Sequence, residues 1–154
     1  MRRLFAALTV TVLLSVLGGN AWGVVQYTVT DLGTLGGYRS SAQDINDRGQ
    51  VVGLSYTTSN INNHAFLYSN GTMTDLGVSQ GELQSRAYGV NTYGQVVGQV
   101  WTSSGASHAF LYSDGTTTDL GTLGGSSSFA RDINDSGQVV GYSYTSSGIY
   151  HAYS

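Results

Sequence analysis

Residues 49–53 read Gly-Gln-Val-Val-Gly, and the same five residues return at 94–98 and at 137–141. Consecutive side chains of a β-strand point to opposite faces, so two adjacent valines make both faces of the strand apolar. A sheet with one wet face would alternate apolar and polar residues instead. The motif therefore predicts small sheets that are covered on both sides, as sheets stacked face to face are.

A period of 44 residues organises the chain around this motif. Asp31, Asp75 and Asp119 each open an Asp-Leu-Gly motif, 44 positions apart. Each unit continues with an Ile-Asn or Val-Asn pair, then Gly-Gln-Val-Val-Gly, then a segment that begins His-Ala. Such self-similarity is typical of repeat architectures. The predicted repeats are 31–74, 75–118 and a truncated 119–154.

Each complete unit contains four strand-forming segments, rich in β-branched and aromatic residues. In the first unit these segments are 41–46, 50–57, 64–69 and 72–76. Asn70-Gly71 is a strong signal for a two-residue hairpin turn, and Asp114-Gly115 repeats it. The expected fold class is all-β, with tandem four-stranded antiparallel blades in a partial or open β-propeller-like array of about three repeats.

The ends of the chain do not coincide with whole units. Residues 25–32 match the fourth strand of the later units and are expected to form a lone fourth strand, whereas Ser154 falls within a third strand. A propeller ring usually needs about four to eight blades. Three alternatives follow: a fragment of a longer repeat protein, an open array, or self-association of chains through unpaired repeat ends.

Residues 1–23 have the layout of a secretory signal peptide, and the β-repeat domain is expected at 24–154. Two arginines precede an apolar run, and small residues then allow cleavage after Ala21 or Gly23. The apolar core is shorter than the ~20 residues of a membrane span, and an uncleaved anchor is the alternative. The mature chain is expected to be secreted by a bacterium, extracellular and not associated with a membrane.

Composition argues against several functional classes. The chain has no Cys, so its sequence offers no disulfide, thiolate metal site or cysteine nucleophile. It has six Arg, no Lys and nine acidic residues, which argues against nucleic acid as a partner. Its 22 Gly and absence of Pro suit many tight turns between ordered elements.

These motifs resemble the HAF repeat proteins, an extracellular family named after its His-Ala-Phe motif. The resemblance covers nearly all of residues 25–154 and recurs in all three units. Two departures are residues 78–81, which read Val-Ser-Gln-Gly where Thr-Leu-Gly-Gly is expected, and Tyr153 in place of Phe. The resemblance implies export and a repeat architecture, and it supplies no catalytic residue.

One His and one motif Asp recur in every unit, as residues required by the construction of a repeat do. His64, His108 and His151 are therefore expected to be structural, and no metal site or cofactor is predicted. The motif Asp is expected to accept backbone N–H bonds. No Gly-x-Ser-x-Gly motif lies between a strand and a helix, so no catalytic residue is assigned and the protein is not expected to be an enzyme.

An aromatic residue lies three positions after Gly-Gln-Val-Val-Gly in every unit. Tyr56, Trp101 and Tyr144 are the candidate ligand-binding residues, because aromatic faces beside Ser- and Asn-rich loops hold sugars in many exported modules. Packing between blades is the alternative. The predicted function is a binding or surface-interaction module for polysaccharide or protein. Two alternatives remain: a purely structural cell-surface array, and a polysaccharide hydrolase or lyase with its site at a propeller mouth.

Overall fold

The structure is a computed structural model that describes residues 27–58, 62–77 and 82–154. The predicted signal peptide at 1–23 lies outside these residues. The chain divides into Met1–Leu32 and a compact unit, Gly33–Ser154. The described ranges hold no helix with the length and apolarity that crossing a membrane requires.

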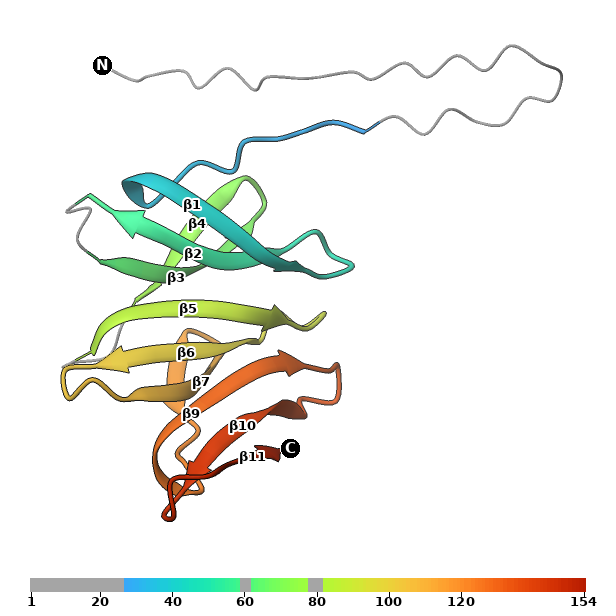
Figure 1. Cartoon of the computed structure of the whole chain (residues 1–154). Helices are drawn as coiled ribbons and strands as arrows, with labels where there is room; N and C mark the ends of the chain where they lie inside the picture. The colour runs from blue at the N-terminus through green and yellow to red at the C-terminus, as the bar shows by residue number, and fades with distance from the viewer. Residues whose placement is uncertain (1–26, 59–61, 78–81) are drawn as a thin grey trace, which may run out of the picture. The chain divides into compact units, whose positions relative to one another are not determined.

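Three antiparallel sheets make up the compact unit and follow one another in chain order (Figure 1). The first sheet contains β1 (Gly36–Ile45), β2 (Val51–Thr57), β3 (Asn63–Ser69) and β4 (Thr72–Gly77), paired in that order. The second contains β5 (Glu82–Val90), β6 (Val96–Thr102), β7 (Ser107–Ser113) and β8 (Thr116–Asp119), again in order. The third contains β9 (Gly124–Ile133), β10 (Val139–Thr145) and β11 (Tyr150–Tyr153). Strands adjacent in sequence therefore pair in space.

The all-β fold and the antiparallel sheets predicted from the sequence are confirmed. The first strand of the first sheet begins at Gly36, earlier than the expected start at residue 41, because Gly36 already pairs with Thr57 of β2. A side chain at Gly37 would overlap the carbonyl group of Tyr56. The absence of a side chain there lets the two backbones approach. The pairing therefore extends into a segment whose glycines indicated a turn in the sequence.

The two-residue hairpin turns also form as predicted. Asn70 and Gly71 have φ angles of 51° and 80°, and Asp114 and Gly115 have φ angles of 52° and 81°. Positive φ at both central residues is the signature of a type I′ turn, whose twist matches that of the flanking strands.

An asparagine closes each hairpin between the first and second strands of a sheet. Asn46 Oδ1 accepts the backbone N–H groups of Arg48 and Gln50, both at 3.0 Å. Asn91 and Asn134 make the same pair of bonds in their own sheets. The side chain thus replaces a backbone acceptor inside the turn.

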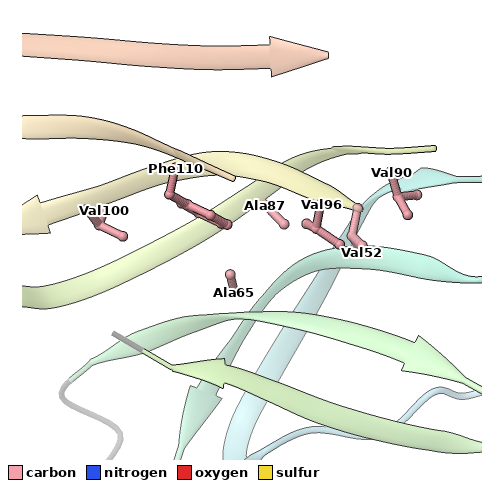
Figure 2. Packing of buried hydrophobic residues seen from close by; sticks show 7 residues of the cluster. All are labelled: Val52, Ala65, Ala87, Val90, Val96, Val100 and Phe110. Atoms are coloured by element: carbon pink, nitrogen blue, oxygen red, sulfur yellow. The ribbon is translucent and has the colours of Figure 1, made fainter. Parts of the chain in front are cut away.

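The main apolar cluster lies between the first and second sheets (Figure 2). Val52 and Ala65 belong to the first sheet, and the remaining members belong to the second. The cluster consists of Val52, Ala65, Ala87, Val90, Val96, Val100 and Phe110. Burial of these side chains removes apolar surface from water and so holds the two sheets together.

A second cluster joins the second and third sheets through Val97, Ala109, Ala130 and Ile133. Val97 belongs to this cluster, whereas the preceding residue, Val96, belongs to the first one. The middle sheet is therefore apolar on both faces and covered on both, as the adjacent valines predicted.

Buried serines add hydrogen bonds between neighbouring sheets. Ser85 Oγ accepts the backbone N–H of Ala65 and donates to the carbonyl oxygen of Gly77, both at 2.8 Å. Ser128 Oγ accepts the backbone N–H of Ala109 at 2.9 Å. A register shift between Ala65 and Phe66 interrupts the regular ladder with β4, and beside it the N–H of Ala65 bonds to a serine of the neighbouring sheet.

Within the described residues 27–32, the lone fourth strand expected at 25–32 is not formed. Residues 27–34 belong to no strand, and residues 25 and 26 lie outside the described ranges. A strand exists only where a neighbouring strand shares its hydrogen bonds, and none of the three described sheets includes these residues.

Candidate functional site

Two of the three recurring histidines, His64 and His108, tie the third strand of a sheet to its fourth. His64 Nδ1 lies 2.9 Å from Asp75 Oδ2, and His108 Nδ1 lies 2.7 Å from Asp119 Oδ2. Asp75 Oδ1 also accepts the backbone N–H of Gly77 at 2.7 Å. These contacts suit the structural role expected of His and of the motif Asp. No group of three metal-ligating side chains gathers within the described ranges.

The three predicted ligand-binding aromatics occupy equivalent places near the ends of β2, β6 and β10. Tyr56, Trp101 and Tyr144 are all half-buried. Each has its own neighbour: Tyr56 and Trp101 each contact an arginine, and the Tyr144 ring lies 5.9 Å from the ring of Tyr150. None of the ring contacts found among the described residues joins one of the three aromatics to another.

Tyr56 forms a compact cluster with Arg39 and Tyr38. The Arg39 guanidinium carbon lies 4.7 Å from the centre of the Tyr56 ring, and Arg39 Nη2 donates to the Tyr56 hydroxyl at 2.8 Å. The Tyr38 ring lies 4.8 Å from the Tyr56 ring. The hydrogen bond from Arg39 lowers the pKa of Tyr56, because it stabilises the phenolate form.

The second sheet carries its own arginine between two aromatic rings. The Arg86 guanidinium carbon lies 5.8 Å from the Trp101 ring and 6.0 Å from the Tyr88 ring. Its Nε is buried and has no hydrogen-bond partner among the described residues. The guanidinium lies within reach of the faces of both rings, which attract a positive charge.

Arg131 extends the pattern to the third sheet. Its guanidinium carbon lies 5.3 Å from the Tyr142 ring, and its Nη2 donates to the Tyr142 hydroxyl at 3.1 Å. It also lies 4.7 Å from the ring of Tyr88 and so bridges the second and third sheets. Phe129 stacks on Tyr142 with ring centres 4.6 Å apart.

Each sheet thus contributes one arginine packed on an aromatic residue of its second strand. We call these six residues the arginine–aromatic set: Arg39, Tyr56, Arg86, Trp101, Arg131 and Tyr142. Two of its aromatics were candidates from the sequence, and the third candidate, Tyr144, lies beside the set without an arginine. The arginines were missed because each pair depends on the register between two strands.

A polar hollow lies at the opposite end of the strands, beside the hairpin turns of the second and third sheets. It is open, has a volume of about 430 Å³, and is lined by Tyr93, Gln95, Ser113, Asp114, Asp135, Ser136 and Gly137. Asp135 Oδ1 accepts the backbone N–H of Thr92 at 2.9 Å, and this bond lowers the pKa of Asp135. The carboxylate therefore serves as a link between two turns.

Comparison with known proteins does not extend this description: no family model, no curated protein and no solved structure matches the chain.

Proposed function

We propose that this chain is an exported, non-enzymatic β-repeat module that binds extracellular polysaccharide through the arginine–aromatic set. The observation that carries the proposal is that every sheet supplies one such pair, with ring-to-guanidinium distances of 4.7, 5.8 and 5.3 Å. Aromatic faces pack on the apolar faces of sugar rings, and guanidinium groups donate to hydroxyl and carboxylate oxygens.

The positions of the arginines support a role beyond folding. One alanine recurs at the same repeat position, as Ala42, Ala87 and Ala130. Arg39 lies three residues before it, Arg86 lies directly before it, and Arg131 lies directly after it. Residues that the repeat itself requires, such as the hairpin asparagine, occupy the same place in every unit. The arginines reach the aromatic residues from three different places, so the repeat pattern alone does not account for them.

The sheets are proposed to be blades of a propeller-like array. The first strands adjoin one another in series, because β1 contacts β5 and β5 contacts β9. Neighbouring sheets also bury apolar faces against each other in the same order as the chain. Both features are expected when small sheets fan around a common axis, with their first strands innermost.

Export and membership of the HAF repeat family are part of the same proposal. The signal-peptide layout of residues 1–23 supports secretion, and the three-fold recurrence of the family motifs supports the family. An extracellular location would give the arginine–aromatic set access to cell-surface or matrix polysaccharide.

A glycan array tests the function with the mature chain and two variants. Trp101→Ala removes the largest ring of the set, and Tyr93→Ala removes an exposed ring from the turn at the opposite end of β6. We expect Trp101→Ala to weaken glycan binding at least tenfold while Tyr93→Ala binds like the unaltered chain. No glycan binding, or equal binding by all three proteins with their circular dichroism unchanged, would contradict the proposal. Such an outcome would favour a protein ligand or a purely structural array.

A further inference from the structure

The first and last sheets each expose a face that is buried in the other sheets. Ile45, at the end of β1, is 64% exposed, whereas its counterparts Val90 and Ile133 are 6% and 5% exposed. Val140 in β10 is 46% exposed, whereas its counterpart Val97 is fully buried. The molecule therefore presents two apolar faces to solvent, one at each end of the array.

These two faces are the two halves of one interface that already occurs twice within the chain. Between the first and second sheets Val52 packs in one cluster with Val90, and between the second and third sheets Val97 packs in one cluster with Ile133. Val140 corresponds to Val52 and Val97, and Ile45 corresponds to Val90 and Ile133. A face carrying Val140 is thus built to receive a face carrying Ile45.

The hydrogen bonds between sheets show the same complementarity. Asn46 Nδ2 donates to the carbonyl oxygen of Asn91 at 2.7 Å, and Asn91 Nδ2 donates to that of Asn134 at 3.1 Å. Asn134 Nδ2 donates only to Gln138 Oε1 within the described residues. Its second N–H remains available for the next carbonyl oxygen of the series, which in a second copy is that of Asn46.

The two end sheets also carry both partners of the serine hydrogen bond that links neighbouring sheets within the chain. Ala152 lies opposite Tyr142 in β10, as Ala65 lies opposite Leu54 in β2, so it occupies the place whose N–H bonds a serine of the next sheet. The serine of the first sheet, Ser40, is exposed and donates to a backbone carbonyl oxygen, that of Gly33, at 2.6 Å. A donating hydroxyl oxygen keeps lone pairs that can accept an N–H.

The third sheet ends in an edge strand among the described residues. β11 is an edge strand in a sheet of three, whereas the other two sheets have four strands. Residues 27–32 read Tyr-Thr-Val-Thr-Asp-Leu and match the fourth strands at 72–76 and 116–120 from their Thr to their Leu. These residues belong to no strand in the chain.

We propose that the mature chain assembles head to tail, with residues 27–32 of one copy added to β11 of another as its fourth strand. This addition would set the Ile45 face of the first copy against the Val140 face of the second. It would also bring Asp31 to His151, as Asp75 lies against His64 and Asp119 against His108. An exposed strand edge is a template for such pairing.

For residues 24–154 as the assembling unit, the number of copies is inferred from the number of sheets, and this step rests on the propeller-like arrangement proposed above. One copy holds three sheets, which is fewer than the about four blades that the smallest propellers need. Two copies hold six complete four-stranded sheets, which falls within the usual range. Two equal junctions then close the ring, so the assembly is a dimer with no open sheet edge.

Disulfide trapping tests the junction, because the chain contains no cysteine of its own. In both complete sheets the third-strand Leu lies opposite the fourth-strand Thr: Leu67 opposite Thr74, and Leu111 opposite Thr118. The same register places Ser154 of one copy opposite Thr30 of the other. We expect Thr30→Cys and Ser154→Cys, mixed as separate proteins and oxidised, to form a heterodisulfide that mass spectrometry identifies. Val29→Cys, whose side chain would point to the other face of the added strand, is the matched control for Thr30→Cys.

The mass of the mature chain in solution, measured by sedimentation, tests the number of copies. We expect twice the mass of the chain, and we expect Ile45→Asp to give a monomer with an unchanged circular dichroism spectrum, because Ile45 is exposed in one copy. Tyr93→Asp is the matched control and should remain a dimer. A monomeric unaltered chain, or equal trapping by both cysteine positions, would overturn the head-to-tail junction.

Larger species that carry the Thr30–Ser154 crosslink would overturn the closed dimer, and with it the propeller-like ring. The glycan test reads a separate property. A dimer whose glycan binding is unaffected by Trp101→Ala refutes the binding proposal alone, and a monomer that binds glycan through Trp101 refutes the assembly alone.

Discussion

The side-chain amide of Asn46 donates to the backbone carbonyl oxygen of Asn91, 2.7 Å away in the next sheet. The same asparagine closes its own hairpin by accepting two backbone N–H groups. One residue type therefore shapes the turn within a sheet and fixes the distance between two sheets. This double use explains why the asparagine occupies the same place in all three units.

Replacement of the middle asparagine tests this double use. Asn91→Ala removes the acceptor for the N–H groups of Tyr93 and Gln95 and the donor to Asn134, at a buried position. We expect the free energy of unfolding in urea to fall by about 3 kcal/mol. Asn91→Asp keeps the acceptor and loses the donor.

The aspartate variant separates the two roles of the side chain, because it keeps the bonds that Oδ1 accepts in the hairpin and loses the bonds that Nδ2 donates to Asn134 O and Gln95 Oε1. A loss of stability confined to Asn91→Ala, with Asn91→Asp as stable as the unaltered chain, would show that the bond between the sheets contributes nothing. We expect Asn91→Asp to lie between the other two proteins.

The hairpin turns and the two-sided middle sheet could be predicted from local sequence. An Asn-Gly pair has one favourable backbone conformation, and the adjacent valines at 96 and 97 point to opposite faces in any strand. Neither inference needs knowledge of a distant residue. The serine bonds differ, because the partner of Ser85 is an alanine 20 residues earlier in another sheet. Nothing near Ser85 in the sequence indicates the register shift between Ala65 and Phe66, beside which the N–H of Ala65 bonds to Ser85.

Removal of the Ser85 hydroxyl tests whether these serines hold the sheets together. Ser85→Ala leaves the N–H of Ala65 and the carbonyl oxygen of Gly77 without this partner, and Ser85 itself is buried. We expect a loss of about 2 kcal/mol in the free energy of unfolding and faster hydrogen exchange at Ala65. Ser41→Ala, at an exposed position of β1, is the matched control and should change stability little. Equal exchange at Ala65 in both variants would argue against the bond.

The central glycine of β6 tests how closely neighbouring strands approach. A Cβ at Gly98 would overlap the carbonyl oxygen of Arg86 in β5 and would lie 2.7 Å from Phe110. We expect Gly98→Ala to lower the free energy of unfolding by about 3 kcal/mol, because backbone atoms cannot move aside without breaking the pairing of β5 with β6.

Gly115→Ala is the comparison for this variant. Gly115 has a positive φ of 81° but no neighbouring atom within 4 Å of a new Cβ, so the expected cost is about 1 kcal/mol from backbone strain alone. If the two variants unfold at the same urea concentration, the close approach of Arg86 is not the reason why position 98 needs a glycine.

The arginine–aromatic set could be predicted only in part. Tyr56 and Trp101 follow from their place after Gly-Gln-Val-Val-Gly, but the arginines that contact them come from the first strand of each sheet. A register shift between Ala87 and Gly89 changes which residues of β5 and β6 lie opposite each other. Counting positions along the two strands therefore gives the wrong neighbours, and only the folded register shows that Arg86 reaches Trp101.

The ionisation of Tyr56 tests the first member of this set. The Arg39 hydrogen bond lowers the pKa of Tyr56 in the folded chain below its ordinary value of 10.0. The folded state therefore releases this proton at a lower pH than the unfolded state does. The contribution of Tyr56 ionisation to the free energy of unfolding therefore appears as the pH rises through the pKa of the folded state. It is complete above the pKa of the unfolded state. The pKa shift of Tyr153 has the opposite sign, because burial raises its pKa and favours the neutral form.

Ultraviolet difference titration isolates the Tyr56 signal by subtracting the Tyr56→Phe variant from the unaltered chain. We expect Arg39→Gln to move that titration to higher pH, towards 10.0, since a neutral amide stabilises the phenolate less than a guanidinium does. Arg48→Gln, on the hairpin turn at the other end of the strands, is the matched control and should leave the titration in place. If Arg39→Gln leaves the midpoint of the Tyr56 titration unchanged, the protein in solution does not form the hydrogen bond from the Arg39 guanidinium to the Tyr56 hydroxyl. The proposed polysaccharide contact at Tyr56 would then depend on the ring alone.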